Sequence, residues 1–319
     1  MRRGRYSLLL AATFITSSNA DAQVAMPPVN MGGTSFMDGV AGPGVLVEPG
    51  VIEHYHASRF LDYKGNTIPG SNSIDVWSNL LHVGYITTRQ LFGAFYGAEF
   101  LLPIASIDVD TDFGPKGKES GLGDLIVSPL ILEWPNRTLF GKPYFSRFSV
   151  LAVLPTGTYS DSRPVNVGSN SGGAFAYYSL TLMPSPRVET SWRLFYLWNR
   201  QNSKPFTAFS TSTTQAGQAI HANYAVSYEV SRSLRLGANG YAFQQISDHR
   251  FGGSSLPNSK ERVVAFGPGV VLSSGFWSAI ANLDFETLTR NRPQGYRLNL
   301  TLRRVFPHMP PKPPNPPPQ

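Results

Sequence analysis

The sequence contains no cysteine among its 319 residues. This absence excludes a disulfide scaffold, thiolate metal sites and cysteine catalysis. The chain also lacks any run of roughly 18 apolar residues, so no transmembrane helix is predicted. Charged residues are scarce, at 15% of the chain, where ordinary soluble domains have roughly 25%. Aromatic residues reach 12%, and a surface poor in charge but rich in rings indicates contact with something other than water.

The N-terminus carries a basic, an apolar and a small-residue segment in that order. Arginines within residues 2–5 precede apolar residues 8–15, and a small-x-small cleavage pattern follows at residues 20–22. This order predicts a secretory signal peptide over residues 1–22. The rest of the chain has a modest basic excess but no Lys/Arg cluster, so no nucleic-acid partner is expected. Export without cysteine fits a bacterial envelope protein.

Segments in which apolar and polar residues alternate recur along the chain. They lie at about residues 50–60, 73–87, 92–107, 122–133, 145–155, 173–183, 187–199, 218–230, 233–245, 261–273, 276–287 and 295–306. A period of two predicts β-strands whose two faces meet different surroundings. The connections alternate between short turns and long polar loops, apart from a connection of intermediate length at 134–144.

Short turns at one end and long loops at the other are typical of an outer-membrane β-barrel. We therefore predict an all-β fold, a transmembrane up-and-down antiparallel barrel of about 12 strands over residues 50–306. Fourteen strands are the alternative if 23–49 and 134–144 also pair. An even number places both termini in the periplasm, with 23–49 as a periplasmic segment. A soluble β-sandwich also alternates, but it explains neither the loop asymmetry nor the aromatic outer face.

The last segment, YRLNLTLRRVF (296–306), shows how the two faces are assigned. Tyr296 and three leucines share one face, whereas Arg297 and Arg303 share the other. An arginine that faces lipid near the midplane costs roughly 2–4 kcal/mol, so these arginines are expected inside. The aromatic end at Phe306 looks like the closing-strand signal that the barrel assembly machinery recognises. That machinery and outer-membrane lipid are therefore expected partners.

The same phasing predicts a set of inward-facing side chains along a path for small hydrophobic solutes. They are Arg235, Asn239, Tyr241, Phe243, Gln245, His221, Glu229, Asp284, Glu286, Arg297 and Arg303. The last two segments are neighbours, so Asp284 and Glu286 are expected opposite Arg297 and Arg303 as a ladder of ion pairs. The ladder could simply neutralise buried charge and hold register, or it could assist solute passage.

Several stretches carry motifs: GLGDLIVSP (121–129), LPTGTYS (154–160), NRPQGY (291–296), LRLGANGYAFQQISD (234–248) and GPGV (267–270). They resemble the putative MetA-pathway of phenol degradation family. The resemblance marks as family-motif residues Gly123, Asp124, Pro155, Thr156, Gly157, Tyr159 and Asn291. It implies an outer-membrane barrel for passive entry of small hydrophobic or aromatic compounds, linked to aromatic catabolism. The proline-rich tail departs from the family pattern, which ends at the aromatic of the final strand.

Two other function classes stay open, a structural or adhesin-like barrel and an outer-membrane hydrolase. A hydrolase would need a serine, a histidine and an orienting polar group that converge at the barrel rim. No spacing in this sequence requires such a site. We therefore predict no enzymatic activity and no cofactor.

Two stretches contain candidate metal ligands. Four acidic residues follow the spacing of a calcium-binding loop: Asp108, Asp110, Asp112 and Glu119. The sixth position, which such a loop needs as glycine, is Phe113. The stretch HYH places His54 and His56 on one strand face without a third ligand nearby in sequence. A solvated acidic loop and histidines at the interface or in the lumen are the simpler interpretations, so no metal site is predicted.

The tail after Phe306 generates the first prediction. Proline dominates residues 307–319 and cannot donate to a strand ladder, so a disordered polyproline-type tail is expected there. Deletion of 307–319 should leave the barrel folded, as measured by different gel migration of boiled and unboiled detergent samples. Identical migration of the two samples would mean that the final strand needs the tail.

Overall fold

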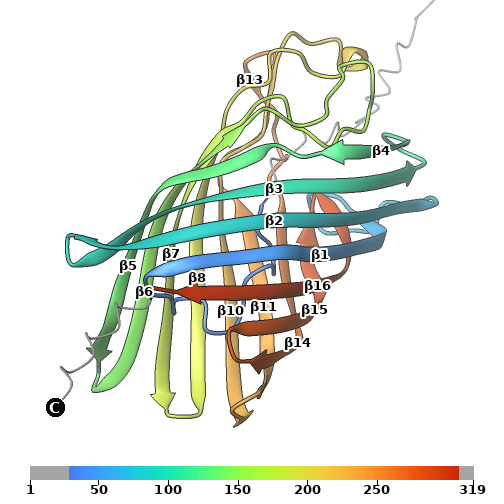
Figure 1. The fold of residues 1–319 in the computed structure, drawn as a ribbon. Coiled ribbons are helices and arrows are strands. Elements are labelled where there is room, and N and C mark those ends of the chain that lie inside the picture. Colours follow the sequence, from blue (N-terminus) through green and yellow to red (C-terminus); the bar gives the residue numbers. More distant parts are fainter. Residues whose placement is uncertain (1–28, 309–319) are drawn as a thin grey trace, which may run out of the picture.

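The computed structural model describes residues 29–308, and its long strands close into one antiparallel barrel (Figure 1). These strands are β1 (Gly44–Leu61), β2 (Asn72–Leu91), β3 (Ala94–Thr111), β5 (Leu125–Leu139), β6 (Lys142–Leu154), β7 (Gly173–Ser185), β8 (Val188–Asn199), β10 (Ala219–Ser231), β11 (Leu234–Gln245), β14 (Arg262–Ser274), β15 (Trp277–Arg290) and β16 (Arg292–Pro307). Pairing of β1 with β16 closes the barrel. Each predicted segment overlaps one of these long strands, so the fold class and the twelve-strand prediction are confirmed.

The remaining elements are short and lie among the long loops. Strand β4 (Gly117–Leu122) pairs with β3 alone, while β9 (Thr214–Gln215), β12 (Arg250–Phe251) and β13 (Ser254–Ser255) form a separate small sheet. A single 3-10 turn, η1, spans Thr207–Phe209. Within residues 29–308, no helix is long and apolar enough to cross a membrane.

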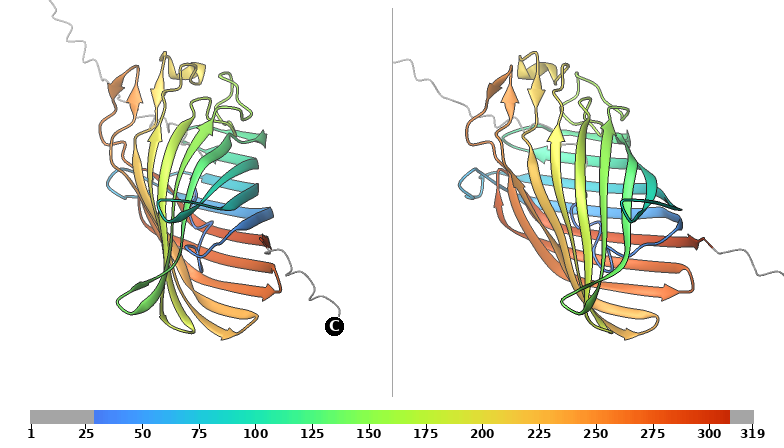
Figure 2. Two further views of the ribbon diagram at one scale, coloured as in Figure 1. Left: turned by 60° about the vertical axis from the view of Figure 1, so that its left-hand side comes forward. Right: turned by 90° about the vertical axis from the view of Figure 1, so that its left-hand side faces the viewer.

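The barrel has two walls whose strands cross. In Figure 1, strands β14–β16 and β1–β3 lie nearly horizontal and cross strands β5–β11, which lie nearly vertical. The views in Figure 2 show the long loops that follow β6, β8 and β11 gathered beyond the upper ends of these strands. The interior of the barrel therefore lies between two crossed walls.

Strand β8 illustrates how the alternating sequence separates the two faces. Trp192, Leu194 and Tyr196 are exposed on the outside, whereas Arg193 and Phe195, between them in sequence, are buried inside. Backbone polar groups are satisfied by the neighbouring strands, as hydrocarbon requires. The period of two thus produces an apolar outer face and a partly polar interior.

The connections correct one part of the sequence prediction. Strands β5 and β6 extend to a two-residue turn at 140–141 instead of ending at the intermediate connection 134–144. Both turn residues have a positive φ, 50° at Phe140 and 73° at Gly141, which suits a tight hairpin. The opposite departure occurs between β15 and β16, where Asn291 alone replaces a long loop.

The N-terminal prediction of a periplasmic segment at 23–49 also needs correction. Residues 44–49 belong to β1, and residues 29–43 lie inside the barrel, where their backbone is bonded to the inner wall. Residues 29–43 form no strand, and residues 134–144 only extend β5 and β6. No further barrel strands arise from these ranges, so the fourteen-strand alternative is wrong. The signal peptide and residues 309–319 of the tail lie outside the described residues. Strand β16 ends at Pro307, one residue into the predicted tail.

The predicted ion-pair ladder between β15 and β16 does not form. Asp284 is the register partner of Arg297, but its carboxylate accepts a 2.7 Å hydrogen bond from Asn239. The acidic partners of the two β16 arginines come from β1, the other neighbour of β16. Arg297 pairs with Glu53 across the β1–β16 pairing, here called the seam.

The second β16 arginine, Arg303, also takes its acidic partner from β1. Arg303 Nε donates to Glu48 Oε1 at 2.7 Å, again across the β1–β16 seam. Glu286, its predicted partner, instead accepts hydrogen bonds from the hydroxyls of Tyr55 at 2.9 Å and Tyr241 at 2.7 Å. The acidic side chains of β15 therefore bond to neutral groups, and both ion pairs of the β16 arginines lie across the β1–β16 seam.

The seam pairs predict a measurable loss of stability. In Arg297→Met, Glu53 loses its cation in the barrel interior, a change that costs about 3–5 kcal/mol for a fully buried pair and less for the partly exposed Glu53. We expect the folded gel band to disappear at a lower temperature, and Glu53→Gln in the same chain to restore part of the loss. Arg304→Met is the control, because Arg304 packs on Trp277 and Phe306 instead of an acid. An equal loss in the control would argue against the seam.

Candidate functional site

The lumen is partly filled by residues 29–43, here called the inner segment. Its polar contacts are spread along the inner wall, on β15, β10, β8, β7 and β5. They are Ser35 with Asn282 of β15 at 3.0 Å, the Gly32 amide with Asn223 of β10 at 3.1 Å, Asp38 with Arg193 of β8 at 2.8 and 2.5 Å, the Gly39 amide with Thr181 of β7 at 2.9 Å and the Ala41 amide with Glu133 of β5 at 3.2 Å. The segment therefore coats one side of the lumen and leaves the side next to β1–β3 free.

A cavity of about 500 Å³ occupies this free side. Its apolar surface comes mainly from β2, β3, β5, β7 and β8, through Leu80, Leu101, Ile107, Ile126, Phe175 and Phe195. The cavity reaches Gly123 and Val167 near the long loops and Gly44 and Val305 near the short turns. It therefore extends along the barrel from one end toward the other.

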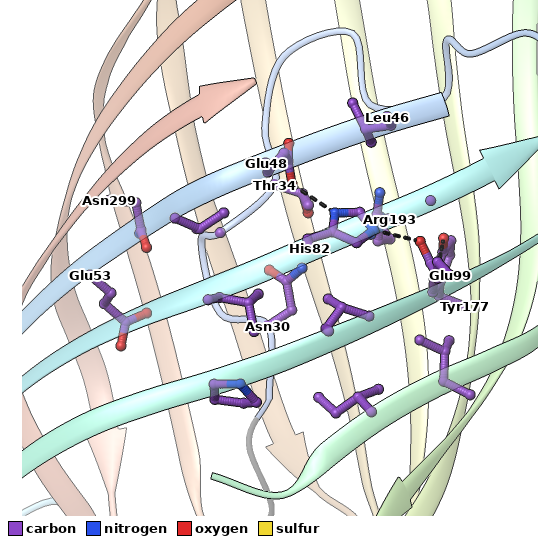
Figure 3. A pocket seen from close by; sticks show the side chains of 18 of the residues that line it. Asn30, Thr34, Leu46, Glu48, Glu53, His82, Glu99, Tyr177, Arg193 and Asn299 are labelled. Carbon is purple, nitrogen blue, oxygen red and sulfur yellow. Dashed lines mark hydrogen bonds and ion pairs between the residues drawn. The ribbon is translucent and has the colours of Figure 1, made fainter. Parts of the chain in front are cut away.

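A line of hydrogen-bonded polar side chains crosses this cavity wall, and we call it the polar bridge. It consists of Arg303, Glu48, His82, Glu99 and Tyr177 from β16, β1, β2, β3 and β7. His82 Nδ1 is hydrogen-bonded to Glu48 at 2.7 Å and Nε2 to Glu99 at 2.9 Å (Figure 3). Ionised carboxylates only accept hydrogen bonds, so an imidazolium ring, which donates from both nitrogens, matches these two partners. The bridge ends where the Tyr177 hydroxyl bonds Glu99 at 3.3 Å.

The other charged groups of the cavity are also paired. Arg193 holds Asp38, and its guanidinium lies 4.3 Å from the centre of the Tyr177 ring. Arg147 donates to the fully buried Glu133 at 2.7 Å. A solute in the cavity would therefore meet apolar side chains and neutralised ion pairs.

The structure brings only two of the eleven residues predicted for the solute path to this cavity, Arg297 and Arg303. Arg235 and Glu229 line a second, smaller cavity of about 180 Å³ near the short turns. The others are buried in the barrel wall away from the larger cavity: His221, Asn239, Tyr241, Phe243, Gln245, Asp284 and Glu286. Sequence phasing could place these side chains inside, but it could not show that the inner segment covers their wall.

Three of these residues show how the covered wall is packed. Tyr241 and Phe243 form a buried cluster with Met31 of the inner segment. The His221 ring stacks on Phe195, with ring centres 3.9 Å apart.

Sequence reasoning missed the polar bridge, although the alternation of β2 puts His82 on the same face as the apolar Leu80 and Val76.

Most of the family-motif residues gather where β4 leads into β5, at the long-loop end of the cavity, whereas Asn291 lies in the turn between β15 and β16. The carboxylate of Asp124, which is fully buried, accepts hydrogen bonds from the Gly157 amide at 2.9 Å and from the Ser169 amide and hydroxyl at 2.9 and 2.5 Å. An added Cβ on Gly157 would lie 2.8 Å from Asp124 and from the backbone of Gly123, so this approach requires glycine. The motif joins the β4–β5 junction to loop 155–172.

The other motif residues also fix loops. Thr156, next to the strand-ending Pro155, accepts a 3.0 Å bond from the Leu125 amide. The Tyr159 hydroxyl donates to the carbonyl of Lys204 at 2.6 Å. Asn291 donates to the carbonyl of Asn258 at 2.6 Å, which ties the turn between β15 and β16 to a neighbouring loop.

The candidate metal ligands have protein partners. Asp108 pairs with Lys118, Asp110 and Asp112 pair with Lys116, and Glu119 pairs with Arg163. The hydrogen bond to Asp110 and the charge of that carboxylate raise the pKa of Lys116. His54 and His56 both bond Asp75, at 3.0 and 3.2 Å. Residues 29–308 contain no group of three acidic, histidine or cysteine side chains that could hold a metal ion.

Comparison with known proteins gives the class first and then the family. The fold resembles an outer membrane channel from Pseudomonas putida F1, with a TM-score of 0.74 and 16% identity over 88% of this chain and 100% of that chain. The chain therefore has the fold of an outer-membrane channel. It belongs to the family described as Putative MetA-pathway of phenol degradation, which it matches over residues 57–302.

Weaker structural similarities point to other outer-membrane barrels. The CymD monoaromatic hydrocarbon channel has a TM-score of 0.40 at 8% identity, over 84% of this chain and 90% of that chain. The translocator domain of the autotransporter NalP from Neisseria meningitidis has a TM-score of 0.44 at 10% identity, over 83% and 90%. No curated protein matches the sequence.

The buried carboxylate of the motif generates a prediction. In Asp124→Ala the donors of Gly157 and Ser169 lose their acceptor, and an unsatisfied buried group costs about 1–3 kcal/mol. Loop 155–172 should become sensitive to trypsin at Arg163 while the heat-resistant barrel persists. Asp110→Ala, which removes only an exposed pair with Lys116, is the matched control. Equal protection of the loop in both variants would show that Asp124 does not hold it.

Proposed function

We propose that this protein is a channel for passive entry of small hydrophobic or aromatic compounds across the Gram-negative outer membrane. The observation that carries the proposal is the apolar cavity that extends along the closed barrel between the long loops and the short turns. The family description, phenol degradation, supports aromatic compounds as the solute class and a link to aromatic catabolism.

The size and chemistry of the cavity suit such solutes. Its volume of about 500 Å³ lies within the roughly 300–1,000 Å³ that is usual for small-molecule sites. Apolar walls with a few placed polar groups bind such a molecule weakly, and weak binding lets it leave again. The ion pairs of the polar bridge satisfy one another, so a neutral solute need not compete with water for an unpaired charge. We assign Arg297 and Arg303 to this path.

The same proposal gives the chain an orientation and partners. Short turns face the periplasm and long loops the exterior in barrels of this type. On this proposal the start of β1 and the end of β16, which pair with each other, face the periplasm, whereas Val29 packs at the long-loop end, against the cluster that contains Leu197 and Phe243. The exposed rings of β8 would contact membrane lipid, and β16, with its aromatic Phe306, would be recognised by the barrel assembly machinery. We propose no enzymatic activity, because His221 packs on Phe195 instead of orienting a serine.

The proposal predicts that an obstruction of the cavity blocks passage. Ala105 of β3 lines the cavity, so Ala105→Trp should slow entry of monoaromatic solutes into liposomes or cells by at least several-fold. Ala98→Trp makes the same change on the same strand, but Ala98 is on the exposed outer face, so it should leave entry unchanged. Entry as fast through Ala105→Trp as through the wild type would count against transport through this cavity.

A further inference from the structure

Phe36 of the inner segment occupies a socket made by two glycines. Gly237 of β11 and Gly269 of β14 are directly opposite each other in the sheet. An added Cβ on Gly269 would lie 2.6 Å from the Phe36 ring and 2.4 Å from Asn239 Oδ1. One on Gly237 would lie 2.7 Å from the ring and 2.2 Å from the Val226 carbonyl oxygen. Ala225 and Ile280 complete the contact, and Phe36 is only 3% exposed. The ring thus fits a recess that any side chain at these positions would fill.

A second attachment follows at once in the chain. Asp38 receives two hydrogen bonds from the Arg193 guanidinium of β8, and both side chains are largely buried. Met37, between the two attachments, has a φ of 55°, in the left-handed region that non-glycine residues seldom adopt. An apolar socket and an ion pair on different strands hold this unfavourable backbone in place.

The attached stretch lies between the two cavities of the lumen. Met37 lines both of them, as does Arg303. Phe36 lines only the smaller cavity, which reaches the short turns through Ser231, Ser233 and Ser273. The Phe36 ring therefore lies next to the residue, Met37, that separates the larger cavity from the smaller one.

We propose that Phe36 determines the size limit of the channel, because its docking between Gly237 and Gly269 holds the inner segment as a partition across the lumen. This inference rests on the proposed function as a channel. It also gives a role to the motif stretches LRLGANGYAFQQISD and GPGV, which supply the two glycines. Phe36 is a positioning residue, since it acts through Met37 and the backbone rather than through contact with the solute.

The test uses the full-length folded protein in liposomes, with neutral polyethylene glycols of increasing size as probes of the opening. Phe36→Ala should shift the size limit to larger polymers and raise single-channel conductance. Gly269→Ala should give the same shift with the ring still present, because the new methyl group occupies the socket. The double variant should shift no further than Phe36→Ala alone, as expected when two changes act on one contact.

Gly42→Ala is the matched control, since Gly42 lies in the inner segment beside the larger cavity and nothing lies within 4 Å of an added Cβ, so its methyl group cannot displace Phe36. Docking itself can be read independently, because the chain has no cysteine. A cysteine pair at Ser35 and Asn282, whose side chains are hydrogen-bonded at 3.0 Å, should form a disulfide in the wild-type background. The yield should fall in Phe36→Ala and in Gly269→Ala.

The outcomes separate this inference from the proposed function. An unchanged size limit in folded Phe36→Ala or Gly269→Ala, with full disulfide yield, overturns the role of Phe36. The same result for Gly42→Ala as for Gly269→Ala also overturns it. A shifted limit in a protein whose wild type passes polymers but no monoaromatic solute supports the role of Phe36 and contradicts the proposed solute class.

Discussion

The interior of this barrel depends on one constraint, that each charged side chain turned inward finds a partner inside. Charges without partners are too costly to bury. The two arginines of β16 meet this constraint across the seam, with Glu53 and Glu48 of β1. Glu48 also accepts from His82, whose other nitrogen donates to Glu99. Closure of the barrel and the polar bridge across the cavity are therefore parts of one bonded network.

The inner segment meets the same constraint on the opposite wall. Arg193 is deeply buried on β8, and its partner Asp38 comes from the segment. Glu133 of β5 similarly accepts from the Ala41 amide in addition to Arg147. The segment thus completes the polar side of the lumen and leaves the apolar surface of β2, β3 and β5 uncovered. The position of the cavity follows from this division.

The sequence allowed the strands to be predicted because the period of two is a local pattern. It failed at 134–144, where Pro135 and Asn136 interrupt the alternation although the ladder continues past an irregularity between Trp134 and Arg137. The acidic partners of Arg297 and Arg303 were sought on β15, the preceding strand. They lie on β1, more than two hundred residues away, and local patterning carries no signal for such a seam.

The candidate site was less accessible from sequence than the fold. Residues 29–43 have no regular period, because each attachment is a separate contact with a distant strand, such as Asp38 with Arg193 and Gly39 with Thr181. The motif glycines 237 and 269 marked the right strands, but their purpose depends on Phe36. The alternating pattern therefore predicted which side chains of the barrel wall face inward. The course of the inner segment and the position of the cavity could be found only from the structure.

The inner segment imposes an order on assembly. It directly precedes β1, yet its contacts lie on β5 to β15, which come later in the chain. Contacts so distant in sequence form slowly. If β1 and β16 joined first, the segment would have to be threaded through a closed ring. We therefore expect the inner segment to bind the later strands while the sheet is still open. Pairing of β1 with β16 would then close the barrel around a segment that is already bound.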